Sequence, residues 1–267
     1  MITVVTICLN AENFIKETMY TVINQKEIEI EYIIKDGDST DKTNDMIDRV
    51  ISENSNPLIH FRHIVLKDSG IYDAMNQAID QSTGEWIIFM NAGDCFYDPF
   101  VLRNAALYMD NKIDVLYGNT LFSMKGGYYF PQIHDVSIIN RHFNLGHQSC
   151  IVRAEIIKKY KFDTRYKIAG DYEQLNRLYC EHRKFVHMNM IISTCNREGI
   201  SCQKTNLQFD EVYRIQHEGK LIKDAQYRRE LWLWKIKGRI ALTFPKWESY
   251  RYCKNNMKRI NADYDKV

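Results

Sequence analysis

The sequence predicts an α/β fold in which a mostly parallel sheet is flanked by helices. Short apolar, β-branched runs alternate with segments of helical periodicity through the first half of the chain, the pattern of a wound parallel sheet. Acidic turns follow the second and fourth runs, where such sheets bind ligands. The composition, 45% hydrophobic and 26% charged over 267 residues, excludes disordered and collagen-like classes.

The first half of the chain supplies four strands and three helices in alternation. The strand candidates are residues 2–8, 30–34, 60–66 and 86–90, and the helices are 14–24, a segment carrying Met46, Ile47, Val50 and Ile51, and 71–81. We expect Asn10 to cap the first helix. The turns at 36–41 and 91–94 both follow strands of one sheet, so we expect them to share one crevice.

The second half mixes the two kinds of element. The pattern predicts a helix around 99–110, a strand at 113–117, a hairpin over 122–130, a helix after Ala154, a helix across 171–182 and a strand at 185–194. Beyond about residue 207 the chain is helical in propensity, basic and aromatic.

Charge concentrates near the end of the chain. Residues 228–260 hold ten Lys or Arg against two acids, a net of +8, which leaves −6 elsewhere in a chain of total charge +2. Three of the four Trp lie among these cations. This mixture favours a segment that lies on an anionic membrane surface. A helical extension packing its aromatic residues on the main domain is the alternative; no nucleic-acid recognition motif accompanies the charge.

Two further features bear on the compartment. The seven Cys include no Cys-x-x-Cys pair, which disfavours a structural zinc site and indicates reduced, mostly buried thiols. The N-terminus lacks the pattern of a secretory signal, and no apolar run reaches the length of a spanning helix. We expect a cytoplasmic protein, with a peripheral place at the inner face of the cell membrane as the alternative.

Carboxylates at strand ends are the first candidates for chemistry. Asp94 follows an apolar strand, and Asn91 and Gly93 add an oxygen ligand and bare backbone beside it. Mg²⁺ or Mn²⁺ takes few carboxylates from a protein when phosphates supply the rest, so the residues suit a cation that bridges a diphosphate. For Asp38 and Asp41 ordinary turn chemistry is the competing explanation, and Asp41 could begin a helix.

Six short motifs follow one another in a fixed order: Thr6 to Asn10, Asp36-Gly37-Asp38-Ser39-Thr40-Asp41, Asp68 to Asn76, Asn91-Ala92-Gly93-Asp94, His147-Gln148 and Gly170-Asp171-Tyr172-Glu173. Their order and spacing resemble the family 2 glycosyltransferases, inverting enzymes of the GT-A fold. The resemblance spans residues 2 to about 200. It implies a Rossmann-like, mostly parallel sheet flanked by helices, here followed by a basic, aromatic C-terminal helical extension.

The resemblance also implies a domain organisation. Residues 1–206 would form the GT-A domain, with a nucleotide-sugar-binding half at 1–97 and an acceptor half at 98–206, and 207–267 would be the extension. Contacts to the donor nucleotide would come from Thr6, Asn10, Asp36, Asp68, Asn76 and Asn91.

The family's metal motif is altered in this chain. Asp94 matches the last carboxylate of the D-x-D region, but Asn91 and Gly93 stand where the family has acids. A Mg²⁺ or Mn²⁺ cofactor would therefore rest on a single carboxylate. The family's commoner Ala-Arg-Asn motif has an arginine at the position of Met75. The contact of that positive side chain with the donor is therefore missing in this chain.

The resemblance assigns the proton acceptor to Asp171, with Glu173 as the runner-up base. An ordinary acid at a helix N-terminus is the competing explanation for Asp171. His147 and Gln148 would lie near the acceptor or the diphosphate, although a lone His is often structural. Residues 197–201 resemble a loop that closes over the donor, or are a plain Gly loop. We expect Asp94 and Asp171 to face each other across a gap wide enough for one hexose.

The predicted function is an inverting glycosyltransferase of cell-surface polysaccharide biosynthesis. It would move a sugar from a nucleotide-sugar, most plausibly UDP-linked, to a hydroxyl of a glycan or lipid-linked saccharide. A sugar-1-phosphate nucleotidyltransferase is one alternative, but residues 8–12 lack its glycine-rich phosphate loop. The other is a non-catalytic nucleotide-binding scaffold, which the altered metal motif keeps open.

Overall fold

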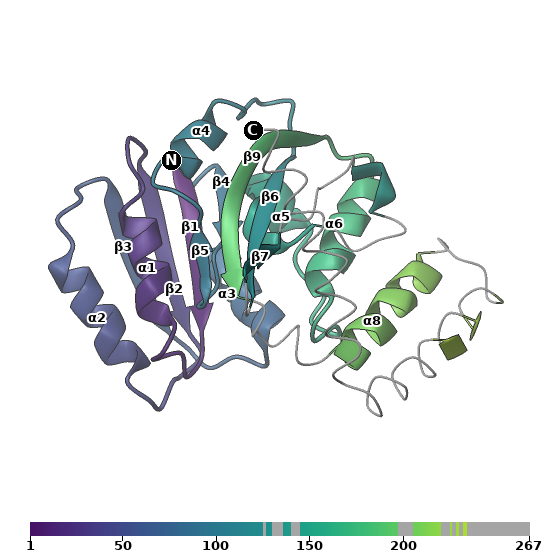
Figure 1. Ribbon diagram of the computed structural model, residues 1–267, viewed down its shortest axis with the longest axis horizontal. Helices are drawn as coiled ribbons and strands as arrows, with labels where there is room; N and C mark the ends of the chain where they lie inside the picture. Colours follow the sequence, from purple (N-terminus) through teal and green to yellow (C-terminus); the bar gives the residue numbers. More distant parts are fainter. Residues whose placement is uncertain are drawn as a thin grey trace.

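The computed structural model forms one curled sheet with helices on both faces (Figure 1). It describes residues 1–124, 127–129, 136–139, 145–196 and 205–219, together with the isolated positions 225, 228, 229, 232 and 233. The predicted alternation of strands and helices is confirmed throughout the first half of the chain.

Four parallel strands build that half of the sheet in the order β3-β2-β1-β4. Their bounds are β1 Ile2–Cys8, β2 Ile30–Asp36, β3 Ile59–Val65 and β4 Trp86–Phe89. β1 and β2 are buried at every position, as expected of β-branched strands covered on both faces. Their carboxyl ends therefore lie at one edge of the sheet.

The second half of the sheet is mixed, so that antiparallel pairs join the parallel strands that were predicted. β8 runs antiparallel to β4 and β6, β9 runs parallel to β6, and β5 runs antiparallel to β9. The bounds are β5 Asp94–Phe96, β6 Val115–Met124, β7 Gly127–Tyr129, β8 Cys150–Arg153 and β9 Phe185–Asn196. Because β8 runs against β4, the residues that precede β8 lie beside the carboxyl end of β4. The predicted hairpin is confirmed as the antiparallel pair of β6 and β7.

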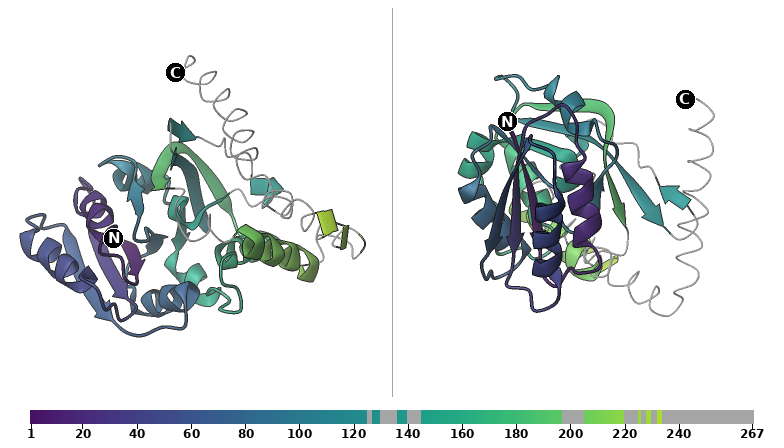
Figure 2. Two further views of the ribbon diagram at one scale, coloured as in Figure 1. Left: turned by 60° about the horizontal axis from the view of Figure 1, so that its bottom comes forward. Right: turned by 90° about the vertical axis from the view of Figure 1, so that its left-hand side faces the viewer.

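Two apolar clusters cover the two faces of the sheet. On one face pack α1 Ile15–Ile23, α2 Thr43–Glu53 and α4 Val101–Ala106. On the other pack α3 Ile71–Gln81, α5 Ala154–Lys159 and α6 Gly170–Cys180, and α8 Thr205–Glu218 adds two residues to the same cluster. Two short 3₁₀ turns, η1 Val136–Ile138 and η2 His147–Ser149, complete the described elements. The views in Figure 2 show α8 at the side of the molecule away from α1 and α2.

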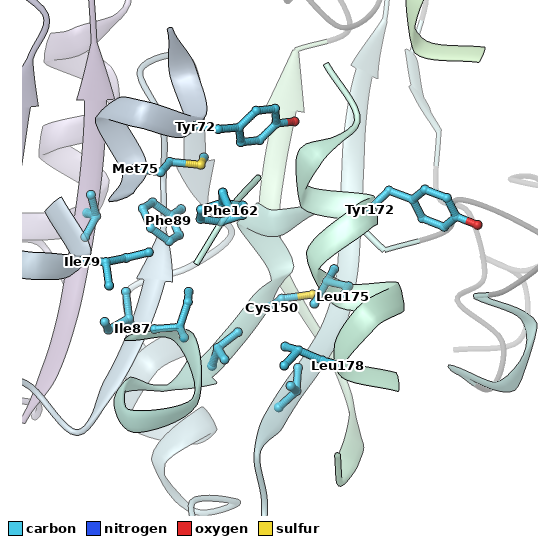
Figure 3. Close-up of a cluster of buried hydrophobic side chains, with 14 of the residues drawn as sticks. Tyr72, Met75, Ile79, Ile87, Phe89, Cys150, Phe162, Tyr172, Leu175 and Leu178 are labelled. Carbon is cyan, nitrogen blue, oxygen red and sulfur yellow. The ribbon is translucent and has the colours of Figure 1, made fainter. Parts of the chain in front are cut away.

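The interface between α3 and α6 fixes the position of both helices beside the end of β4. Tyr72 stacks on Phe162 with ring centroids 5.5 Å apart, and Phe89 meets Phe162 edge-on at 5.5 Å. Figure 3 shows the Tyr72 hydroxyl directed toward the start of α6, while Tyr172 points away on the opposite side of that helix. The first turn of α6 is thus held by side chains from other elements.

One predicted cap is wrong. α1 begins at Ile15 with Phe14 at its cap position and no side-chain cap bond, so Asn10 does not cap it. Asn10 has a left-handed backbone (φ 50°), and its Oδ1 accepts the N–H of Thr40 at 2.9 Å. Asp41 does lie at the start of a helix, where it accepts the N–H and hydroxyl of Thr43 in α2.

Most of the basic segment 228–260 and the loop 197–201 lie outside the described residues, so the predictions made for them stay predictions. The described helices include none long and apolar enough to cross a membrane. Of the five Cys in the described ranges, four are buried and all five are free, as predicted.

Candidate active site

Three predicted residues from distant parts of the chain meet beyond the end of β4. Asp94 lies at the start of β5, His147 begins the turn before β8, and Asp171 is in the first turn of α6. The His147 Nδ1 lies 3.2 Å from Asp171 Oδ2, and its Nε2 lies 3.8 Å from Asp94 Oδ2. We call these three side chains the acid–histidine row.

The gap predicted between the two carboxylates is not there, because the imidazole of His147 fills it. A cavity beside His147 and Asp171, lined also by Phe89, Phe162 and Leu175, measures about 10 Å³, which is too small for a sugar. Asp94 and His147 each expose 20% of their side chains and Asp171 exposes 9%. Solvent therefore reaches the row from the side of Asp94 and His147.

Asn91 sets the tautomer of the histidine. Its amide nitrogen lies 2.9 Å from His147 Nε2 and can only donate, so Nε2 accepts and Nδ1 carries the proton donated to Asp171. Burial lowers the pKa of His147, but the hydrogen bond and charge of Asp171 and the charge of Asp94 outweigh it and raise that pKa. The two carboxylates therefore increase the basicity of the ring.

The pKa of Asp94 is raised as well, but here the rise disfavours the charged form of the side chain. Burial raises the pKa of this carboxyl, and the His147 charge and a hydrogen bond from Cys195 counter only part of the rise. Gln148, also predicted at this place, is buried and donates to the Cys195 sulfur at 3.0 Å. Gln148 thus holds the Cys195 thiol, which in turn forms a hydrogen bond with Asp94.

Asp171 is held from three sides. Its Oδ1 accepts the N–H of Tyr172 at 2.9 Å and lies 3.3 Å from the Tyr72 hydroxyl, and its Oδ2 faces His147. Glu173, the runner-up base, forms a two-point ion pair with Arg177 instead. Burial raises the pKa of Glu173, and the Arg177 hydrogen bonds oppose that rise.

Residues near Asp94 could hold a divalent cation. Asn91 Oδ1 is buried and lacks a hydrogen-bond partner among the described residues, so it is an oxygen that a cation could satisfy. With one Asp94 oxygen it would supply two hard ligands, and the described residues contain no cluster of three or more His, Cys, Asp or Glu suited to a metal. The fit is to a cation held mainly by a diphosphate.

Two of the predicted donor contacts are corrected. Thr6 is fully buried, donates to the Met90 carbonyl at 2.7 Å and bonds the Tyr32 hydroxyl, so it ties β1 to the end of β4 rather than lining a pocket. Asn76 uses both ends of its amide on the backbone of Phe162, at 2.9 Å each. It joins α3 to the segment after α5.

Asp36 is likewise a turn-forming residue rather than a surface ligand. It is fully buried, and its carboxylate accepts the N–H of Ser39 at 2.7 Å and the Ser39 hydroxyl. Asn10 is exposed beside this turn and donates its N–H to the same hydroxyl. The turns after β1 and β2 therefore meet, and of this pair Asn10 is the one open to a ligand.

Asp68 is paired with a buried lysine. Lys35 is fully buried and its Nζ lies 2.5 Å from Asp68 Oδ2, while Asp68 Oδ1 accepts the N–H of Gly70. A buried ammonium needs such a partner. The prediction that Asp68 contacts a donor would require its remaining 11% exposed surface.

A second depression lies away from the row. A groove of about 740 Å³ follows the outer side of α1, between Lys16, Tyr20, Met46 and Pro99. Asp94, His147 and Asp171 are not among the residues that line it, so we assign it no part in the chemistry.

The sequence analysis did not predict a role for Tyr72, Cys195 or Glu211. The buried carboxylate of Glu211 accepts hydrogen bonds from the segment before α6. From the sequence pattern, Tyr72 is expected on the apolar face of α3 and Cys195 in the core as part of a strand. No local pattern marks contacts that form between elements so distant in sequence.

Comparisons with known proteins bear on the family and the fold. The family model described as glycosyl transferase family 2 matches residues 3–180. A PGL/p-HBAD biosynthesis glycosyltransferase of Mycobacterium bovis is 23% identical over 203 residues, which cover 74% of this chain and 78% of that protein. TuaG of Bacillus subtilis, a candidate teichuronic acid biosynthesis glycosyltransferase, is 30% identical over 94 residues, 35% of this chain and 36% of that protein.

Solved structures share the fold. TarS 1-349 of S. aureus, in complex with UDP-GlcNAc, superposes with a TM-score of 0.64 at 19% identity, covering 86% of this chain and 70% of that one. The mannosyltransferase PcManGT of Pyrobaculum calidifontis, in complex with GDP-Man and Mn²⁺, gives 0.64 at 13% identity over 87% and 69%.

Proposed function

Because this chain belongs to glycosyl transferase family 2 and has the GT-A fold of such enzymes, we propose that it transfers a sugar from a UDP-sugar to a hydroxyl of a saccharide. Inversion at the anomeric carbon is a single in-line displacement: the acceptor oxygen bonds to that carbon as the bond to the diphosphate breaks. The reaction needs an acceptor for the hydroxyl proton and stabilisation of the leaving diphosphate.

The acid–histidine row carries this proposal. The His147 side chain is 20% exposed; Asp171 accepts the N–H of Nδ1, and Nε2 lies at the Asp94 end of the ring. The hydroxyl proton would pass to the His147–Asp171 pair, with Asp171 holding the ring in the tautomer that leaves Nε2 free to accept. To reach Nε2, the hydroxyl would replace the hydrogen bond from the Asn91 amide.

Asp94 and Asn91 Oδ1 would hold Mg²⁺ or Mn²⁺. When bound, the cation would neutralise charge on the departing diphosphate. The partly exposed Asp94 side chain and the partnerless Asn91 oxygen support this assignment. Asn10, exposed where the turns after β1 and β2 meet, would contact the nucleoside.

A place in cell-surface polysaccharide biosynthesis is the broader part of the proposal. It draws on TuaG, a candidate enzyme of teichuronic acid biosynthesis, and on the match to TarS with bound UDP-GlcNAc. A saccharide or lipid-linked acceptor is part of the same proposal.

A ligand screen tests the donor. The melting temperature of the protein would be measured with nucleoside diphosphates and their sugars, with and without Mn²⁺, since a ligand of the native state raises it. We expect the largest shift with UDP or a UDP-sugar and a further rise with Mn²⁺. Release of nucleoside diphosphate from the best donor would separate an enzyme from a scaffold; no shift with any nucleotide would refute the proposal.

A further inference from the structure

Glu211 lies in α8, beyond the residues that the family model matches, and its carboxylate is buried. The residue is 4% exposed. Three backbone N–H groups donate to it: Lys167 to Oε1 at 2.8 Å, Ile168 to Oε2 at 2.9 Å and Ala169 to Oε2 at 2.8 Å. Hydrogen bonds to a buried carboxylate are strong, and a buried charge left without them is costly. Glu211 therefore fixes the path of residues 167–169.

That path leads directly into α6. Ala169 occupies the cap position of this helix, and Asp171 is two residues further on. The carbonyl of Ile168 accepts the Tyr72 hydroxyl at 2.7 Å, and the same hydroxyl lies 3.3 Å from Asp171 Oδ1. A shift of residues 167–169 would thus move the hydroxyl and the carboxylate together.

The start of α6 has little room to relax. A Cβ on Gly170 would lie 2.7 Å from the Tyr72 ring, so the ring and the backbone are already in close contact. On the other side of α6, Gln216 of α8 donates to the Tyr172 hydroxyl at 3.1 Å. α8 packs beside α6 (Figure 1) and contacts both the segment before that helix and its first turn.

From these contacts we propose that Glu211 is a positioning residue for the Asp171–His147 pair. It acts through the backbone of residues 167–169, which aims Asp171 Oδ2 at His147 Nδ1. The proposal rests on the proposed function for its kinetic consequence, but its structural consequence can be measured without activity.

The main variant is Glu211→Gln, with Glu218→Gln as its matched control. Glutamine keeps the shape but turns an NH₂ group toward N–H donors of the 167–169 segment. Glu218 lies on the same helix, is 47% exposed and accepts the Tyr166 hydroxyl at 3.1 Å. If Glu211→Gln does not fold, Glu211→Asp keeps the charge and shifts its position.

The first measurement needs no substrate. In protein labelled with ¹⁵N-histidine, the imidazole signals of His147 are assigned by their loss in a His147→Gln variant. We expect Glu211→Gln to shift the Nδ1 signal and speed amide exchange across residues 167–173, and Glu218→Gln to leave the His147 signals in place. Faster exchange with unchanged His147 signals would reduce Glu211 to a structural residue and overturn the proposal.

The second measurement is a double-mutant cycle on turnover of the best UDP-sugar. Misplacing a catalytic pair costs about 10- to 100-fold in kcat, so we expect that loss from Glu211→Gln with little change in the donor KM. In an Asp171→Asn background the same change should add little, because both substitutions remove one effect. Additive losses would contradict the proposal. An enzyme that turns over no donor would count against the proposed function instead, and the histidine signals would still decide the role of Glu211.

Discussion

His147 is the side chain on which the site depends, because it touches both acids that the chemistry needs. Nδ1 of the ring faces Asp171 and Nε2 faces Asp94, so the ring connects the two carboxylates. Asp171 is 6% exposed and has its oxygens occupied by Tyr72, Tyr172 and His147. In the proposed mechanism Asp171 would therefore act on the acceptor hydroxyl through the ring.

The first residue-scale prediction concerns the proton. Asp171→Asn should lower sugar transfer by about 10²-fold or more, the usual loss when general-base assistance disappears, and His147→Gln should do the same. Glu173→Gln is the matched comparison, since its carboxylate pairs with Arg177, and it should keep most of the activity. Rates of nucleoside diphosphate release measure all three; full activity in Asp171→Asn would remove this residue from the mechanism.

The second residue-scale prediction concerns the cation. Asp94→Ala should lower transfer by about 10²-fold, the scale of lost electrostatic stabilisation, and should abolish the extra melting-temperature rise that Mn²⁺ gives with UDP. Asp171→Asn should retain that rise, which separates the two roles. A Mn²⁺ effect that survives in Asp94→Ala would mean that the cation binds elsewhere.

Among the elements, the amino ends of β1, β2 and β4 are joined by one buried acid. Glu31 in β2 is 5% exposed and accepts the Thr3 hydroxyl at 2.6 Å, the Thr83 N–H at 2.8 Å and the Thr83 hydroxyl at 2.8 Å. Burial raises the pKa of Glu31, but these hydrogen bonds and that of Gly84 outweigh it and lower the pKa below its ordinary 4.5. The edge opposite the site is thus held by a charged group.

This arrangement predicts a pH dependence of stability. A carboxyl whose folded-state pKa is lowered stabilises the fold above its unfolded pKa, and that contribution is lost as the pH falls through the folded value. Glu31→Gln should cost about 1–3 kcal/mol of unfolding free energy at pH ~7. Urea unfolding should show the difference from the parent shrinking below pH ~4; a difference that persists or grows in acid would contradict this role for Glu31.

At the scale of the whole molecule, the basic segment sets the charge distribution. Residues 228–260 carry +8 in a chain of net charge +2. A cationic, Trp-containing segment is attracted to anionic lipid, and salt weakens the attraction.

The resulting prediction is that the full chain sediments with anionic phospholipid vesicles at low salt. Neutral vesicles and raised salt are the controls, and both should release the protein. Failure to bind anionic vesicles would favour the alternative, in which the aromatic residues of the segment pack on the catalytic domain.

The alternation of strand and helix and the positions of the motifs were predictable because they depend on local periodicity and on residues close in sequence. The four parallel strands, the helix from 71 to 81 and Asp94 at a strand end came from such patterns, whereas Asp171 came from the family resemblance. The prediction that Asn10 caps α1 was wrong because residues 11–14 form a turn before the helix begins at Ile15. Periodicity locates the ends of helices poorly.

The mixed half of the sheet, the row and the roles of the buried polar residues depended on the tertiary structure. Strand order brings residue 147 to residues 94 and 171, and one imidazole then takes the space expected for a sugar. The side chains of Thr6, Asn76 and Glu211 form hydrogen bonds with partners 26 to 86 residues away. A sequence lists which groups can form hydrogen bonds, but only the packed chain decides which of them meet, because burial forces each polar group to bond whatever lies beside it.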